Sequence, residues 1–304
     1  MQPLIECIPN ISEGRRQALV AHLASTAARA GAALLDRSSD ADHHRTVLTL
    51  AAPVKVMVGA VEALAEAVFT NVDLRRHRGV HPRLGALDVV AFAPLAGAEM
   101  SDAVEAARLT AERLGERFEL PVCLYGAALE RPELAALRRG GPKAFAERLK
   151  TRELVPDAGP PRWDPRRGTT AVGARFYLVA FNVVLKSKNL DVARDIARAI
   201  RASAEDGLPA VRALGLPLNS RRCVQVSMNI LDYRQTSLHA AFRRVRDEAA
   251  KLGVEVEGSE IVGLAPRAAL TGGPLAELSL LHQAAPRVLE SRLSALGLPA
   301  ELVT

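Results

Sequence analysis

The stretch A-L-D-V-V-A-F-A, residues 86–93, decides the fold of this chain. It is a nearly continuous apolar run that is followed by Pro94, and Asp88 is its one charged residue. Strands that are buried on both faces read in this way, whereas half-exposed strands alternate apolar and polar residues. The run therefore predicts a central strand in a sheet that is covered on both sides.

The segment just before this strand, R-R-H-R-G-V-H-P-R-L-G at residues 75–85, is basic and carries two histidines. His81 directly precedes Pro82, and the residue before a proline is disfavoured in the helical conformation. We therefore expect a turn or an extended segment to present the imidazole. Nearby positive charge favours the neutral form of a histidine, and a neutral imidazole suits a general base for an anionic substrate. A basic surface loop with a solvated histidine is the alternative, and spacing alone does not choose.

Composition bounds the class of protein. The chain has 304 residues, enough for two domains with their own cores, and 49% of its residues are hydrophobic. Its net charge of +6 favours anionic partners, but only 4% of residues are aromatic, which argues against the base-stacking modes of nucleic-acid binding. We therefore expect small anionic ligands and no nucleic-acid partner.

The cysteines and the apolar runs indicate the compartment. Cys7, Cys123 and Cys223 lie far apart in apolar runs and form no C-x-x-C pair, which favours buried, inert thiols over a metal or redox site. No run reaches the ~18 apolar residues of a membrane helix, and the N-terminus does not resemble a signal peptide. These features predict a cytoplasmic protein with no metal and no membrane partner.

Further elements follow from apolar periodicity in the first half of the chain. Strands are predicted at residues 4–9, 32–36, 46–51 and 121–125, and helices at 14–30, 53–69 and 100–117, with short helical pieces over 127–150. Ser12 or Asn10 is the expected cap of the first helix. The polar residues 36–45 read as a loop. Residues 155–175, rich in Pro, Gly and Arg and holding the only tryptophan, predict an irregular binding loop, with a flexible interdomain linker as the alternative.

The second half has a different order of elements. Strands are predicted at 176–185, 211–218, 223–231 and 254–263, and helices at 189–202 and 237–252, followed by a helical tail over 266–304. This βαββαβ order is typical of a ferredoxin-like arrangement. We therefore expect an α+β/α/β protein with two α/β subdomains, residues 1–177 and 178–304, whose sheets are flanked by helices.

Short catalytic motifs are absent: the sequence holds no dinucleotide fingerprint, P-loop, H-E-x-x-H or G-x-S-x-G. Longer strings are more specific. E-C-I-P-N-I-S-E-G (6–14), H-R-G-V-H-P-R-L-G-A-L-D-V (77–89), P-V-C-L-Y-G (121–126), Q-V-S-M-N-I-L-D (225–232) and E-G-S-E-I-V-G-L-A-P (257–266) occur in order over nearly the whole chain. Through them the sequence resembles the glutamate formimidoyltransferase (formiminotransferase) family, in its stand-alone form without the cyclodeaminase domain.

That resemblance implies an activity. The family transfers the formimino group from N-formimidoyl-L-glutamate to N5 of tetrahydrofolate, a co-substrate, and the products are L-glutamate and 5-formiminotetrahydrofolate. It also implies a homodimer whose two subdomains bind folate between them. A related transferase that takes a formyl group or another donor, and a non-catalytic folate-binding protein, are the alternatives.

The resemblance also implies site residues. The catalytic histidine of the family corresponds to His81, not to His77. The folate-contacting segment corresponds to Gly159, Pro160, Pro161, Arg162, Trp163, Asp164, Pro165, Arg166, Arg167 and Gly168. Both substrates carry carboxylates, which arginine forks suit, so Arg45, Arg83, Arg166 and Arg167 are candidate partners. Asp36, Asp42 or Asp88 is expected to orient His81 or the amidinium.

Overall fold

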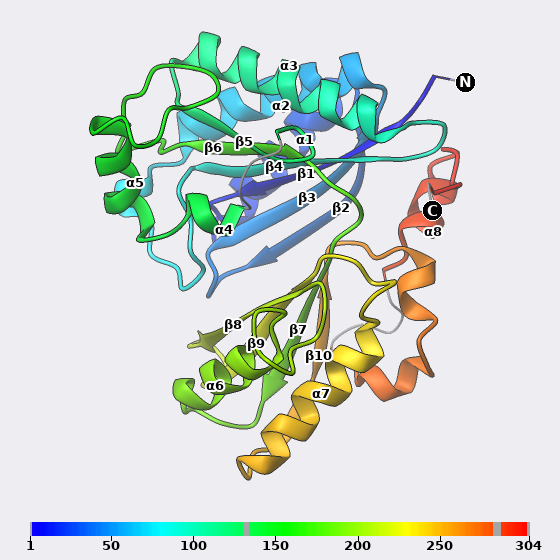
Figure 1. Ribbon diagram of the computed structural model, residues 1–304. Helices are drawn as coiled ribbons and strands as arrows, with labels where there is room; N and C mark the ends of the chain where they lie inside the picture. The colour runs from blue at the N-terminus through cyan, green and yellow to red at the C-terminus, as the bar shows by residue number, and fades with distance from the viewer. Residues whose placement is uncertain (1, 130–133, 282–286, 303–304) are drawn as a thin grey trace. The chain divides into compact units, whose positions relative to one another are not determined.

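A computed structural model of the chain describes residues 2–129, 134–281 and 287–302. It consists of two units, residues 1–175 with 299–304, and residues 176–298. Each unit contains one sheet with helices beside it (Figure 1). The expectation of two sheet-containing α/β subdomains with flanking helices is therefore confirmed.

The first unit is built on a six-stranded sheet of order β2-β3-β1-β4-β6-β5. Its strands are β1 (Ile5–Ile11), β2 (Ala33–Asp40), β3 (Arg45–Ala52), β4 (Leu87–Pro94), β5 (Val122–Gly126) and β6 (Thr170–Ala174). β1 pairs antiparallel with β3 and β4, whereas β6 pairs parallel with β4 and β5. Every residue of β4 is buried, which confirms the central strand predicted from residues 86–93.

Three helices, α1 (Gln17–Arg29), α2 (Val54–Asn71) and α3 (Met100–Phe118), cover one face of this sheet (Figure 1). They pack on an aliphatic core in which Leu48, Leu64 and Phe92 are fully buried. The expected cap of the first helix is wrong. Neither Asn10 nor Ser12 caps α1, because Ser12 donates its hydroxyl instead to the Gly85 carbonyl at 2.7 Å.

Two further expectations for this unit are wrong. The loop expected over residues 36–45 is limited to the turn at 41–44, because β2 continues to Asp40 and pairs with β3. Residues 155–175 are not irregular throughout, because β6 lies between β4 and β5. A Cβ on its Gly173 would lie 2.6 Å from the Tyr125 ring. Backbone pairing between strands needs no local apolar pattern, so neither strand segment was visible in the sequence.

The opposite face of the sheet is divided. Over β5 and β6 it is covered by α4 (Leu134–Leu137) and α5 (Gly141–Lys150), whose Phe145 and Leu149 pack with Cys123 and Tyr125. The remainder carries polar side chains. Cross-strand register places Asp36, Asp40, Asn10 and Arg45 on this face, since Asp40 pairs with Arg45 and both Ser38 and Asn10 pair with Val47.

The second unit contains β7 (Val179–Leu185), α6 (Leu190–Ile200), β8 (Val211–Leu218), β9 (Cys223–Ile230), α7 (Leu238–Lys251) and β10 (Val256–Val262). Its sheet has the order β10-β7-β9-β8, and every pairing in it is antiparallel. The helices bury Ile196, Ile200 and Phe242 against one face. Short helical segments follow: η2 (Arg267–Leu270), η3 (Leu275–Leu278) and α8 (Leu289–Ala295).

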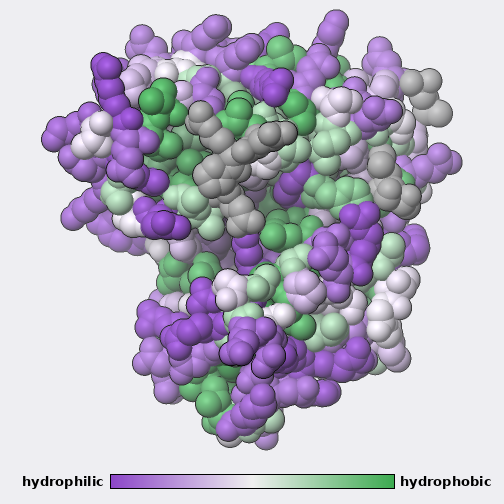
Figure 2. Space-filling model, viewed as in Figure 1, coloured by the Kyte–Doolittle hydropathy of each residue, from purple (hydrophilic) through white to green (hydrophobic). Residues whose placement is uncertain are grey.

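The surface and the thiols agree with the composition. Hydrophilic side chains cover much of the face shown in Figure 2, and large exposed apolar residues such as Val56 and Leu252 occur singly. None of the three cysteines forms a disulfide; Cys7 and Cys123 are buried as expected, whereas Cys223 is half-buried. No helix in the described ranges is both long and apolar enough to cross a membrane.

Candidate functional site

His81 is presented by the loop that joins α2 to β4. After η1 (Leu74–Arg76) the chain forms no regular element until Gly85, so the expected non-helical setting of the imidazole is confirmed. The loop lies against the turn over residues 41–44. Val80 donates its N–H to the Asp42 carbonyl at 3.1 Å, and the ring Nε2 of His77 lies 2.8 Å from the His44 carbonyl.

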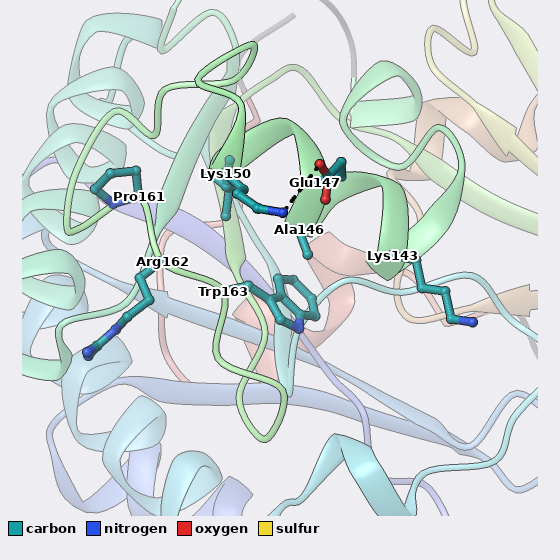
Figure 3. Close-up of a pocket in the computed structure, with 8 residues that line it drawn as sticks. Lys143, Ala146, Glu147, Lys150, Pro161, Arg162 and Trp163 are labelled. Atoms are coloured by element: carbon teal, nitrogen blue, oxygen red, sulfur yellow. Dashed lines mark ion pairs between the residues drawn. The ribbon is translucent and has the colours of Figure 1, made fainter.

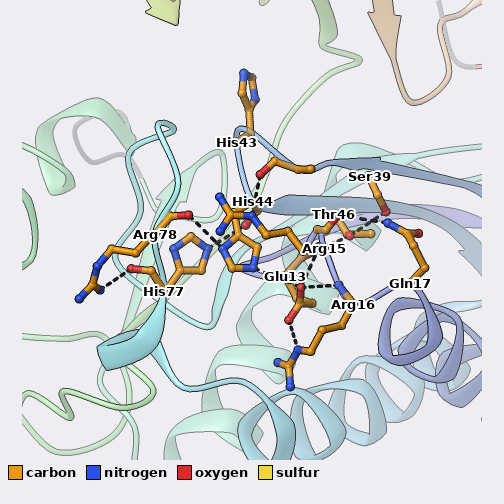
Figure 4. A network of polar contacts seen from close by, with 12 residues as sticks. Glu13, Arg15, Arg16, Gln17, Ser39, His43, His44, Thr46, His77 and Arg78 are labelled. Atoms are coloured by element: carbon orange, nitrogen blue, oxygen red, sulfur yellow. Dashed lines mark hydrogen bonds and ion pairs between the residues drawn. The ribbon is translucent and has the colours of Figure 1, made fainter. Parts of the chain in front are cut away.

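Gly79 allows this close approach. A Cβ at this position would lie 2.4 Å from the His43 carbonyl oxygen, so a larger residue would push the loop away from the turn. The rings of His44 and His77 stack with centroids 4.0 Å apart and planes inclined by 21°. Figure 4 shows these side chains in one polar network with Glu13.

Glu13 is the buried carboxylate of that network. It accepts hydrogen bonds from the N–H groups of Arg15 at 2.8 Å and Arg16 at 3.0 Å and from the Arg16 Nε at 2.6 Å, and it lies 3.2 Å from the Nε2 of His44. Burial by itself raises the pKa of Glu13, but these hydrogen bonds outweigh it and lower the pKa to about 2. The carboxylate therefore stays charged and holds the turn under the histidine loop.

We expect Glu13→Gln to lower the free energy of unfolding by roughly 2 kcal/mol at pH 7. A carboxylate whose folded-state pKa is depressed stabilises the fold above its unfolded pKa, and the contribution is lost as pH falls toward the folded value. The difference between wild type and variant should therefore shrink between pH 4.5 and about 2. Urea unfolding at pH 7 and pH 2.5 measures this difference in the free energy of unfolding. Glu116→Gln, at an exposed position, is the control. A difference that does not change with pH contradicts this account of Glu13.

The imidazole of His81 contacts one carbonyl and one guanidinium. Its Nδ1 lies 2.8 Å from the carbonyl oxygen of Pro82. Nη1 of Arg45 lies 2.8 Å from its Nε2 and 2.9 Å from its Nδ1. Burial, followed by the positive charges of Arg45 and Arg138, lowers the pKa of His81 well below its usual value. A neutral base at neutral pH results.

Arg45 and Arg83 both contact the His81 loop. Arg45 extends from the start of β3 and also donates to the Asn10 side-chain oxygen. Arg83 donates its Nε to the His81 carbonyl at 3.0 Å, contacts the His77 ring, and donates to the His43 carbonyl at 3.2 Å. Burial lowers the pKa of each of these two arginines to about 10.

Asp88 anchors the loop. Its Oδ1 accepts the backbone N–H groups of Leu84 at 2.7 Å and Gly85 at 3.1 Å, and its Oδ2 pairs with Arg138. Asp36 lies on β2 opposite Thr49. Sequence reasoning did not single out Arg138, which follows α4 in a region recognised only as basic and helical.

The basic loop at 159–168 meets the end of the His81 loop. Gly168 forms a bridge with Gly85, and the N–H of Ala86 donates to the Arg167 carbonyl at 2.8 Å. Gly168 has a φ of +76°, and a Cβ there would lie 1.9 Å from the Leu84 carbonyl oxygen. At the other end Gly159, with a φ of +74°, packs against Leu120 in the same way. Both glycines are needed for close packing of this loop.

The charged residues of this loop largely build the loop itself. Arg167 pairs with Asp164 at 2.5 Å and donates to the Phe118 carbonyl at 2.9 Å. Arg166 donates to the Thr70 carbonyl at 2.8 Å. The structure therefore separates the four candidate arginines, because Arg45 and Arg83 contact the His81 loop while Arg166 and Arg167 hold the second loop to α2 and α3.

Trp163 packs against α5, with its ring 5.8 Å from that of Phe145. Beside it is a hollow of about 510 Å³ (Figure 3). Its walls are Lys143, Ala146, Glu147, Leu149, Lys150, Pro161, Arg162 and Trp163. Pro161, Arg162, Pro165 and Arg166 are exposed along the loop, and Pro160 accepts the Arg162 N–H at 2.8 Å. Over residues 2–129, 134–281 and 287–302, no group of three or more His, Cys, Asp or Glu side chains is placed to hold a metal ion.

The loop between α2 and β4 thus places a histidine of lowered pKa beside the half-buried Arg45 and Arg83. Residues 4–175 match the N-terminal subdomain of the formiminotransferase domain, and residues 180–275 match the formiminotransferase domain. This chain therefore belongs to the formiminotransferase family, as the sequence resemblance indicated.

Several relatives extend over most of the chain. The glutamate formimidoyltransferase of Streptococcus pyogenes serotype M1 is 41% identical over 89% of this chain and 91% of its own length. That of Thermoplasma acidophilum is 39% identical over 88% and 89%. The formimidoyltransferase-cyclodeaminase of Sus scrofa is 40% identical over 89% of this chain, which spans 51% of that longer protein.

Proposed function

We propose that this chain is an enzyme that transfers the formimino group from N-formimidoyl-L-glutamate to N5 of tetrahydrofolate, with His81 as the proton acceptor. Family membership over nearly the whole chain carries the reaction class. The observation that supports the role of His81 is its imidazole of lowered pKa, whose Nε2 and Nδ1 lie 2.8 and 2.9 Å from Nη1 of Arg45.

The reaction needs one proton to move between two nitrogens. N5 of tetrahydrofolate attacks the amidine carbon, and a new carbon–nitrogen bond forms in a tetrahedral intermediate. Nε2 of His81 takes the proton that N5 loses and gives it to the glutamate nitrogen as the old carbon–nitrogen bond breaks. L-Glutamate and 5-formiminotetrahydrofolate leave, and His81 returns to its neutral form. Such acid–base catalysis raises the reaction rate by roughly 10²- to 10⁴-fold. Orientation of the two reactants lowers the activation barrier by about 7–11 kcal/mol more.

Incubation of the protein with tetrahydrofolate and N-formimidoyl-L-glutamate tests the activity, since a new folate absorbance should appear together with L-glutamate. N-Formyl-L-glutamate in place of the formimino donor tests for formyl transfer. Folate binding without turnover on either donor would reject the enzymatic proposal in favour of a binding protein.

The pH dependence of kcat/KM tests the state of His81. Burial and the neighbouring arginines lower the pKa of His81. We therefore expect kcat/KM to stay high down to pH 6.5 and to fall only at lower pH, along the acid limb of the profile. Arg45→Gln removes one of these charges and should move the limb to higher pH by roughly one unit. The exposed Arg37→Gln is the control. A limb that stays in place in Arg45→Gln argues against His81 as the titrating base.

We also propose folate contacts along Gly159–Gly168, a homodimer and a cytoplasmic location, in line with the sequence analysis. The order of elements supports a ferredoxin-like second unit. The exposed Pro161, Arg162, Pro165 and Arg166 support the folate contacts. Light scattering of the purified protein tests the dimer.

A further inference from the structure

Arg45, Arg83 and Arg138 gather around His81, and Asp40 and Asp42 lie near the adjacent His43. Arg45, Arg83 and Arg138 influence one another electrostatically, and the neighbouring charge of Arg138, after burial, lowers the pKa of Arg45. Asp88 is the carboxylate that pairs with Arg138. His81 and His77 add no charge, because the pKa of each is lowered. Three guanidinium groups thus lie near His81, and Asp88 pairs with one of them.

Two donors in this cluster are buried and unused. Within the described residues, the Nε atoms of Arg45 and Arg138 have no hydrogen-bond partner. Buried polar groups are nearly always hydrogen-bonded, and an unpaired buried charge is costly. A guanidinium presents its donors as a planar fork that matches a carboxylate. The pattern therefore indicates a site that is completed by a carboxylate ligand.

We propose that Arg138, together with Arg45, binds the α-carboxylate of the formimino donor beside His81. The inference rests on the proposed function, which supplies a donor with two carboxylates. Of these, the α-carboxylate is attached to the carbon that bears the departing nitrogen. That nitrogen must receive its proton from His81, so the α-carboxylate is the one that lies nearest to His81 and Arg45.

Binding would also free the base. Arg45 Nη1 lies 2.8 Å from Nε2 and 2.9 Å from Nδ1 of His81. A carboxylate that takes the donors of Arg45 competes with this contact, so Nε2 becomes available when the donor is in place. Asp88 keeps Arg138 aimed at the site, since its Oδ2 pairs with that side chain.

The test uses calorimetry with N-acetyl-L-glutamate, an unreactive donor analogue, and its α-amide and γ-amide. The wild-type protein should bind the α-amide roughly 10- to 100-fold more weakly than the free acid, the usual effect of losing a charged hydrogen bond. Arg138→Gln should weaken binding of the free acid by a similar factor. The variant should then bind the free acid no more tightly than the α-amide. Any preference for the free acid over the γ-amide should remain. Arg138→Lys should restore part of the affinity, and the exposed neighbour Arg139→Gln should bind like wild type.

Equal wild-type affinity for the free acid and its α-amide overturns the proposal without any variant. An undiminished α-carboxylate preference in folded Arg138→Gln and Arg138→Lys proteins also overturns it, with thermal melting as the check on folding. If the wild-type protein shows no formimino transfer but its binding depends on Arg138 as described, the transferase function fails and the carboxylate site stands.

Discussion

Replacing His81 by alanine lowers the turnover of formimino transfer by roughly 10²- to 10⁴-fold, the contribution of a positioned acid–base group. The reason is local, because burial and the charges of Arg45 and Arg138 lower the pKa of the imidazole, which therefore offers a free ring nitrogen at neutral pH. No other group in the proposed reaction accepts the proton from N5. The fold should persist, because the His81 side chain is only half-buried and belongs to no core cluster.

Steady-state kinetics at saturating tetrahydrofolate measure this effect on kcat, and a thermal melt checks the fold. His22→Ala is the matched control, since this histidine is exposed on α1. Turnover in the His81 variant within a few-fold of wild type would remove His81 from the mechanism.

Replacing Asp88 by alanine should lower the free energy of unfolding by roughly 3–5 kcal/mol. The carboxylate is buried and accepts the N–H groups of Leu84 and Gly85 while it pairs with Arg138. Its removal leaves Arg138, with 17% of its side chain exposed, without its paired carboxylate. The loop that presents His81 also loses its anchor, so turnover should fall as well.

Chemical unfolding of wild type, Asp88→Ala and Asp88→Asn measures both parts of this effect. Asparagine retains an oxygen for the two backbone N–H groups but no charge for Arg138, so its stability should lie between the other two. Asp88→Ala with a loss below about 1 kcal/mol would show that the buried pair is not a principal anchor.

Much of the first unit was predictable because its elements carry local signals. The apolar run at residues 86–93 and the apolar spacing of residues 53–69 correspond to β4 and α2. Local sequence signals failed to predict segments whose conformation is determined by pairing with other strands and not by their own side chains. β6 has only five residues and is stabilised by parallel pairing with β4 and β5, which begin 83 and 48 residues earlier in the chain.

The candidate site was predictable in part for the same reason. Pro82 and Gly79 make the non-helical conformation around His81 a local property, and the resemblance to a family selected this histidine over His77. Arg45 was among the candidates. Arg138 was not, because no feature of its own sequence region distinguishes it from the adjacent Arg139.

The sequence by itself determined the central strand, the flanking helices and a loop that offers a histidine in basic surroundings. These depend on apolar periodicity and on backbone restrictions that act within a few residues. Only the tertiary structure decided that Arg45, Asp88 and Arg138 surround His81 and that Arg166 and Arg167 are bonded elsewhere. Such proximity depends on the pairing of β3, β1 and β4 and on the packing of the segment after α4, and these long-range contacts leave no local pattern in the chain.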